Sequence, residues 1–142
     1  MTFELVRGEL PLKLRGLFKP WAIDVGHGKV LLRGFLGGED GEFPRTFDVL
    51  FQDVSRISLA DQYRDLCVSV ADPETTRAEE QRTGGKWRDS KLFLLSEGST
   101  YDYVVAGYLF WAEVSVFAGE RSPLMEESPA PESIKENKVF RV

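Results

Sequence analysis

The sequence predicts a mainly β fold, all-β or α+β: an antiparallel curved sheet forming a roll, a sandwich or a partly open barrel, with at most one or two short helices. Three observations favour this fold class. Apolar and polar residues alternate with a period of two in residues 46–54 and 66–72. Glycine-rich turns separate short apolar segments in the first half of the chain. Long segments with the apolar stripe of an amphipathic helix are lacking.

Residues 22–54 indicate consecutive antiparallel strands. The segments AIDV and KVLLRGFL are joined by the turn sequence GHG, which is typical of a β-hairpin. The polar, glycine-rich sequence GGEDGEF predicts the next turn. It is followed by a strand in which Phe47, Val49 and Phe51 alternate with more polar residues, so we expect one face of this strand to point inward.

The segment SRISLADQYRDL, residues 55–66, supports two interpretations. Ser58 and Asp61 imitate a capping box, and Leu59, Tyr63 and Leu66 could line one face of a short helix. An irregular loop fits equally well. The following residues, LCVSVAD, return to strict alternation and predict a strand.

Residues 73–85 carry helix signals but little apolar surface. Asp72 is a candidate N-cap, Pro73 occupies the first helical position, and Gly84 stands where a helix would stop. Between Pro73 and Gly84 only Ala78 is apolar, so packing cannot hold a helix there. We therefore expect an exposed, mobile excursion.

The stretch YVVAGYLFWAEVSVF, residues 103–117, contains a single charge, Glu113. Its valines and aromatic residues favour a strand, and Gly107 marks a bulge or bend within it. Up to Trp111 both faces are apolar, whereas Glu113 and Ser115 lie on a polar face. Glu113 is either a solvated strand residue or the polar anchor of a pocket in the curved sheet.

The size of the chain, 142 residues, favours a single domain. We expect residues 1–120 to form one β-rich domain. Residues 121–142 form a proline-punctuated C-terminal tail, whose final VFRV segment can add an edge strand.

Charge and hydropathy limit the classes of partner. The chain has a net charge of −5, which makes general nucleic-acid binding an unfavourable interpretation. Residues 1–35 hold six basic and three acidic residues, a balance of +3 that leaves −8 for residues 36–142. No secretory signal or membrane-spanning run is recognisable, so we expect a cytoplasmic protein that does not enter membranes.

No motif indicates catalysis, a cofactor or a metal. The GHGK sequence lacks the first glycine and the following helix of a phosphate loop. His27 is the only histidine and Cys67 the only cysteine, which leaves no multi-histidine or multi-cysteine metal site. We therefore expect a non-enzymatic protein without a cofactor.

Two functional hypotheses follow. The first is a protein-binding domain, acting as an inhibitor, immunity-type protein or adaptor, whose acidic surface attracts a basic partner. Its candidate contacts are acidic residues of the turn and of the excursion, with one tryptophan: Glu39, Asp40, Glu42, Glu74, Glu79, Glu80 and Trp87. The alternative is a small-molecule-binding curved sheet or barrel with a pocket formed by Trp21, Tyr103, Trp111 and Glu113. A subunit of a larger assembly is a third interpretation, and the oligomeric state is left open.

In size, charge and strand content, the chain is similar to small acidic bacterial proteins, including immunity proteins that bind a partner toxin. No motif stands behind this similarity, so it assigns no residue a role.

Overall fold

The computed structural model describes residues 3–37, 45–98, 102–130 and 132–142, in which ten strands and one α-helix occur. The strands are β1 (Glu4–Arg7), β2 (Leu12–Asp24), β3 (Lys29–Leu36), β4 (Arg45–Gln52), β5 (Arg56–Ser58), β6 (Tyr63–Val70), β7 (Lys91–Leu94), β8 (Tyr103–Ala106), β9 (Tyr108–Val114) and β10 (Lys138–Arg141). The helix is α1 (Pro73–Thr83), and the short 3-10 turns are η1 (Val25–His27), η3 (Pro123–Met125) and η4 (Lys135–Asn137).

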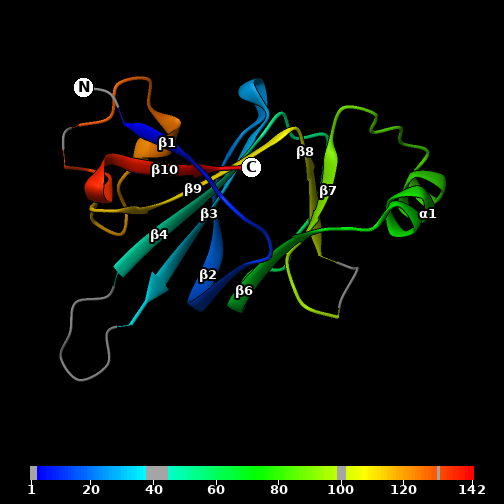
Figure 1. The fold of residues 1–142 in the computed structure, drawn as a ribbon, viewed down its shortest axis with the longest axis horizontal. Helices are drawn as coiled ribbons and strands as arrows, with labels where there is room; N and C mark the ends of the chain where they lie inside the picture. The colour runs from blue at the N-terminus through cyan, green and yellow to red at the C-terminus, as the bar shows by residue number, and fades with distance from the viewer. Residues whose placement is uncertain (1–2, 38–44, 99–101, 131) are drawn as a thin grey trace.

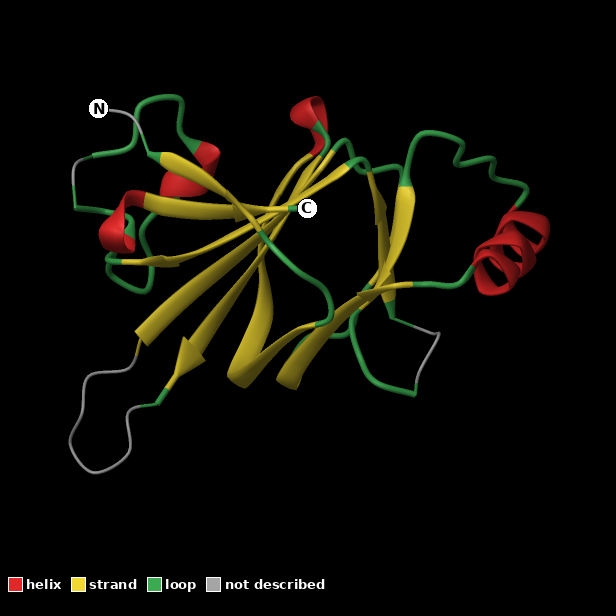
Figure 2. Cartoon of the chain, viewed as in Figure 1, coloured by secondary structure: helices red, strands yellow, loops and turns green. Residues whose placement is uncertain are grey.

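All ten strands belong to one curled sheet that does not close, in the order β1-β10-β9-β4-β3-β2-β6-β7-β8-β5. Every pairing is antiparallel except that of β1 with β10. Figures 1 and 2 show the strands wrapping around a common interior, with α1 at one end of the molecule. The predicted mainly β fold, an antiparallel curved sheet with few short helices, is confirmed.

Gly107 produces the bend that the sequence indicated. It separates β8 from β9, and its N–H lies 3.0 Å from the carbonyl oxygen of Gln52 and 3.2 Å from that of Asp53. The neighbouring segment of the sheet bends at the same level: β4 pairs with β9, and β5 pairs with β8. Because both segments change direction together, the sheet folds over its own interior while the pairing continues on each side of the bend.

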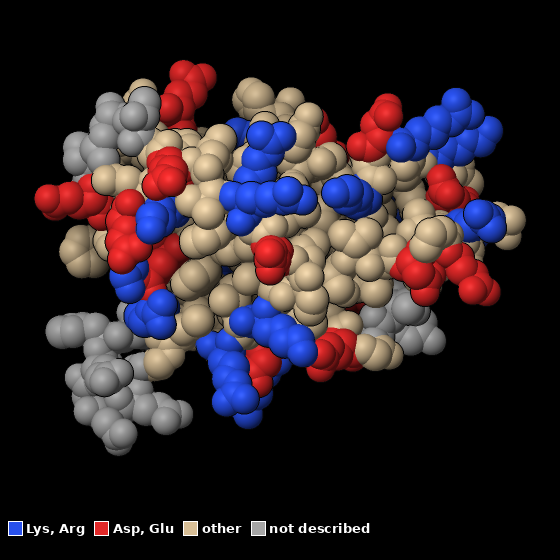
Figure 3. All heavy atoms as spheres, viewed as in Figure 1, with Lys and Arg blue, Asp and Glu red and all other residues tan. Residues whose placement is uncertain are grey.

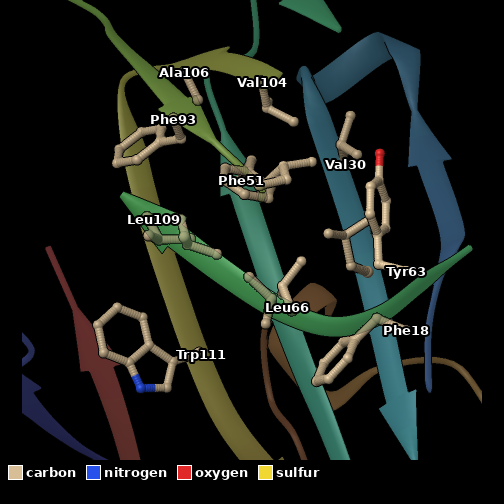
Figure 4. Packing of buried hydrophobic residues seen from close by; sticks show 14 residues of the cluster. Phe18, Val30, Phe51, Tyr63, Leu66, Phe93, Val104, Ala106, Leu109 and Trp111 are labelled. Atoms are coloured by element: carbon tan, nitrogen blue, oxygen red, sulfur yellow. The ribbon is translucent and has the colours of Figure 1, made fainter. Parts of the chain in front are cut away.

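The interior of the curled sheet is filled by side chains. Phe51 and Phe93 lie near its centre with ring centroids 5.7 Å apart (Figure 4). The buried cluster draws residues from seven strands: Phe18, Val30, Leu32, Val49, Phe51, Tyr63, Leu66, Val68, Phe93, Leu95, Val104, Ala106, Leu109 and Trp111. Removal of this apolar surface from water is the main stabilising contribution to the fold.

The C-terminal part of the chain covers the outer face of the sheet. Met125 packs against Leu31 and Leu50, and Ile134 forms a bridge with Val114. The predicted C-terminal strand is β10, but it lies between β1 and β9 rather than at the edge. The edge on that side is β1, seen beside β10 in Figure 1.

The outer face also contains a buried ion pair between β3 and β4. Arg33 and Asp48 are direct register partners, and both side chains are fully buried. The guanidinium donates from Nε to Oδ1 at 2.8 Å and from Nη2 to Oδ2 at 2.9 Å. Its Nη1 donates to the carbonyl oxygens of Ala118 and Glu120, at 3.0 and 2.6 Å. This one side chain therefore connects two central strands to the turn that follows β9.

Two local predictions require correction. Residues 55–66 do not form a helix, and they are not irregular throughout. Arg56–Ser58 form β5, and Tyr63 begins β6. β4 does not have one polar face, since Asp48 and Leu50 are as buried as Val49 and Phe51. In both cases a segment far away in the sequence decides the structure: β8 pairs with the exposed β5, and the segment with Met125 buries Leu50 of β4.

Residues 73–83 form helix α1, so the expectation that this segment would not hold a helix is wrong, whereas its exposure is confirmed. None of its residues is buried, as its polar composition indicated. Its ends are nevertheless satisfied: Asp72 Oδ1 accepts a 2.7 Å hydrogen bond from Thr75 N, and Gly84 adopts a left-handed conformation at the C-terminus. Caps, an ion pair within the helix and a hydrogen bond to the sheet stabilise it in place of an apolar face.

We expect Asp48→Ala to lower the free energy of unfolding by about 3–5 kcal/mol, because it leaves the buried Arg33 guanidinium without its carboxylate. Urea unfolding followed by tryptophan fluorescence measures this change. The control is Asp61→Ala, at an exposed position of the turn before β6, which should alter stability by no more than about 0.5 kcal/mol. Equal effects of the two substitutions would contradict the importance assigned to the pair.

Candidate functional site

The acidic candidates of α1 are largely used inside the protein. Tyr103 Oη donates a 2.7 Å hydrogen bond to Glu79 Oε2, and Arg82 Nη2 lies 2.8 Å from the same oxygen. Glu80 Oε2 accepts a hydrogen bond from Trp87 N at 2.9 Å. Glu79 therefore attaches the helix to β8, and Glu80 attaches it to the segment that follows the helix.

The environment of Glu79 favours its charged form. Hydrogen bonds from Arg82 and then Tyr103 lower the pKa of Glu79, outweighing the opposing effect of burial. Such a carboxylate is a stable acceptor, and its lowered pKa makes it a poor proton donor near neutral pH.

Trp87 packs on the protein's own sheet. It lies against a buried cluster that contains Leu92, Tyr103 and Val105. Gly85 lies close to this side chain, since a Cβ atom at that position would come within 2.9 Å of the Trp87 ring. Of the predicted contacts of the excursion, Glu74 is fully on the surface. Glu39, Asp40 and Glu42 lie outside the described residues.

The four residues of the predicted ligand pocket are not brought together. Tyr103 belongs to the buried cluster beside Trp87, whereas Trp111 is part of the sheet interior and stacks on Phe140 with ring centroids 5.8 Å apart. Trp21 lies on β2, edge-on to Phe35 and 5.5 Å from the Arg33 guanidinium. Of the four residues, Trp111 belongs to the packed cluster seen in Figure 4.

Glu113 is held by two cations at the rim of the sheet. It forms ion pairs with Arg45 on β4 and, at 3.0 Å, with Lys135 of η4. Burial acts to raise the pKa of Glu113, but the hydrogen bonds from Lys135 and Arg45 outweigh burial and the net pKa is lowered. The carboxylate therefore connects the C-terminal segment to β4, which answers the question that its isolated charge raised.

His27 and Cys67 show no catalytic arrangement in the described ranges. The exposed His27 ring lies 3.0 Å from Asp24 Oδ2, and this hydrogen bond lowers the pKa of Asp24. Burial raises the pKa of the Cys67 thiol, which disfavours the reactive thiolate. No group of three or more histidine, cysteine, aspartate or glutamate residues in this part of the chain could hold a metal ion.

An apolar groove beside β1 is the feature that the sequence-based candidates missed. We use the name apolar groove for a cavity of about 180 Å³ whose apolar walls include Phe3, Leu5, Phe110, Leu124 and Val139. Glu126 is its only charged lining residue in the described ranges. The groove therefore lies between the edge strand β1, strand β9 and the covering segment that contains η3.

Large apolar side chains remain exposed at this groove. Leu5 is 52% exposed and Phe3 38%, although both line the cavity. Tyr108, 40% exposed, stacks on Phe110 with ring centroids 6.4 Å apart and extends the apolar surface. The alternation of Phe3 and Leu5 was a signal for this face, but nothing local indicates that β1 would lie at a sheet edge with these side chains unburied.

Charges are unevenly distributed over the surface. In the view of Figure 3, many acidic side chains lie toward the two ends of the molecule, and basic side chains gather in the middle, where Figure 1 places the C-terminus.

No helix in the described ranges is long and apolar enough to span a membrane. The chain matches no protein-family model, and no curated protein or solved structure gives a significant match.

The lowered pKa of Glu113 gives a pH-dependent contribution to stability. A folded-state pKa below the ordinary value of 4.5 stabilises the protein above that value, and the contribution disappears as the pH falls through the folded-state pKa. We expect Glu113→Gln to lower stability at neutral pH and to make the decline below about pH 5 shallower than in the parent protein. Urea unfolding from neutral to acidic pH measures both effects, with the exposed Glu74→Gln as control. A parallel decline in parent protein and Glu113→Gln would contradict this role.

Proposed function

We propose that the protein is a non-enzymatic protein-binding domain, of the inhibitor, immunity or adaptor type, which docks a basic partner on the apolar groove. The observation that carries this proposal is the exposure of Phe3, Leu5 and Tyr108 around a cavity with apolar walls. Exposed apolar surface with a polar rim is characteristic of protein interaction sites.

The groove has the anatomy of an interface centre. Its walls are apolar, and an aromatic residue adjoins them, as in the cores of protein interfaces. It also lies beside a sheet edge of four residues, Glu4–Arg7, which is paired on one side only, with β10. A partner side chain that fills the groove would remove Leu5 and Phe3 from water, which is favourable at about 25 cal/mol per Å² of apolar surface.

Charge specifies the kind of partner. Glu126 is the charged residue that lines the groove, Arg141 lies beside the adjoining Tyr108, and the whole chain has a net charge of −5. Complementary charge steers association and selects partners more than it adds affinity. The occupant that fits is therefore a partner segment with a large apolar side chain between lysine or arginine residues.

Synthetic peptides test this specificity directly. We expect fluorescein-labelled peptides with a central leucine or phenylalanine flanked by lysines to bind, as measured by fluorescence anisotropy at low salt. Peptides with glutamate flanks should bind at least about tenfold more weakly, because like charges at the rim oppose docking. Equal binding of the two series would overturn the assignment of a basic partner.

Two matched substitutions locate the binding surface. Leu5→Ala should weaken the lysine-flanked peptides by roughly tenfold, since it removes an apolar contact at the centre of the groove. Ile23→Ala is the control, because Ile23 is 54% exposed on β2 and lies outside the groove. Light scattering supplies a further outcome: a dimer that Leu5→Ala abolishes would assign the groove to a second copy of the chain and overturn the proposal.

The rim charge has its own pair of variants. We expect Glu126→Lys to weaken the same lysine-flanked peptides, whereas Glu74→Lys, an equal charge reversal on α1, should have a smaller effect at physiological salt because screening limits its range. Equal effects of the two reversals would show that net charge alone governs binding.

A further inference from the structure

A second cavity, of about 460 Å³, also borders β1, and its lining includes three cationic side chains. Arg7 comes from β1, Arg141 from β10 and Lys91 from the first position of β7. No acidic residue of the described ranges lines this cavity. We refer to it as the cationic cavity.

The two arginines are placed side by side by the sheet. β1 and β10 are parallel neighbours, and Arg7 is the direct register partner of Arg141. Like charges opposite each other on adjacent strands are destabilising. Within the described ranges, no carboxylate forms an ion pair with Arg7, Arg141 or Lys91.

The backbone around the arginines is well fixed. Gly8 N donates a 2.8 Å hydrogen bond to the carbonyl oxygen of Arg141, and Gly8 lies flat against Trp111, where a Cβ atom would come within 2.2 Å of the indole. The Arg141 guanidinium lies 5.6 Å from the centre of the Tyr108 ring. The contacts of Gly8 therefore fix the backbone between β1 and β10, and the third contact fixes the Arg141 guanidinium beside Tyr108.

Another cavity of the protein is lined by both cationic and acidic side chains. A cavity of about 480 Å³ is lined by Lys13, Arg15 and Arg64, together with Asp65 and Glu97. Here Lys13 forms a 2.9 Å ion pair with Glu97. That cavity contains acidic residues beside its cations, whereas the described lining of the cationic cavity contains none.

We propose that the cationic cavity binds a small soluble ligand bearing a phosphate or diphosphate group. A phosphate that lies between Arg7 and Arg141 would accept hydrogen bonds from both planar guanidinium groups, which match phosphate oxygens in paired geometry. Lys91 contributes a third positive charge from the opposite wall. This site lies apart from the apolar groove in chemistry and adds a ligand to the protein-binding function.

Calorimetric titration with pyrophosphate at low ionic strength tests the site, with inorganic phosphate as a second probe. We expect saturable binding at one site, tighter for pyrophosphate because its charge is larger. Arg7→Gln and Arg141→Gln should each weaken pyrophosphate binding by at least about tenfold, as expected for loss of a charge-assisted hydrogen-bonding group. Arg64→Gln, in the cavity that also contains Asp65 and Glu97, should leave the affinity for pyrophosphate unchanged.

The outcomes separate a built site from general charge attraction. Absence of saturable binding, or an equal loss in Arg64→Gln, would overturn the proposal. Binding to phosphatidylglycerol vesicles without binding to pyrophosphate would also overturn it. The peptide experiments on the apolar groove are separated from this test by Arg7→Gln, because Arg7 lines the cationic cavity and not the groove, whereas Arg141 contacts Tyr108 beside the groove.

Thermal unfolding of the free variants provides the structural control. Relief of repulsion predicts that Arg7→Gln melts no lower than the parent protein and that pyrophosphate raises its melting temperature less. If both arginine variants melt lower, Lys91→Gln decides the question, since Lys91 lies outside the β1–β10 pair. An unchanged pyrophosphate affinity in Lys91→Gln would then overturn the proposal.

Discussion

The buried pair of Arg33 and Asp48 is the interaction on which the arrangement of the C-terminal half depends. An isolated charge at this depth would be strongly destabilising, so each side chain is tolerated only while the other is in place. The remaining N–H groups of Arg33 point to the carbonyl oxygens of Ala118 and Glu120, which fixes where the chain goes after β9. An apolar pair could fill the same volume, but it could not hold that turn by directed hydrogen bonds. The pair thus links the register of β3 and β4 to the path of the covering segment.

Both candidate sites lie downstream of this linkage. From the turn held by Arg33 the chain passes through η3, whose Leu124 forms a wall of the apolar groove, and reaches Ile134, which bridges to Val114. Glu113 secures the same segment through Lys135. β10 then enters the sheet beside β9, and β1 adds to its other side. Leu5 and Arg7, two positions apart, lie on the same face of β1; Leu5 lines both the groove and the cationic cavity, whereas Arg7 lines only the cavity. The two surfaces therefore share one short edge strand whose position depends on interactions formed far away in the fold.

This dependence explains what could be predicted from the sequence. Alternation and glycine turns identified the antiparallel sheet, the hairpin of β2 and β3, and the bend at Gly107, because each is encoded within a few residues. Helix α1 was missed because its stabilisation comes from caps and from Glu79 bonded to Tyr103 on another strand. The Arg33–Asp48 pair and the juxtaposition of Arg7 with Arg141 follow from strand register, which no local pattern specifies. The predicted pocket of aromatic residues failed for the opposite reason: Tyr103 and Trp111 are apolar material for two different buried clusters.

The acidic net charge and the proposed contacts act over different distances. A net charge of −5 influences which partners approach, but its effect is averaged over the surface and is screened within about 10 Å in ordinary salt. At contact distance the decisive quantities are local. Glu79 and Glu80 are already bonded within the protein, and Glu126 lies beside exposed apolar side chains. The described lining of the cationic cavity contains arginines and a lysine but no acidic residue. A chain that is acidic as a whole therefore presents, beside its edge strand β1, an apolar groove lined by one charged residue, Glu126, and a cationic cavity. Composition determines the acidic net charge, whereas the groove and the cationic cavity arise only when β1 and β10 pair in the sheet.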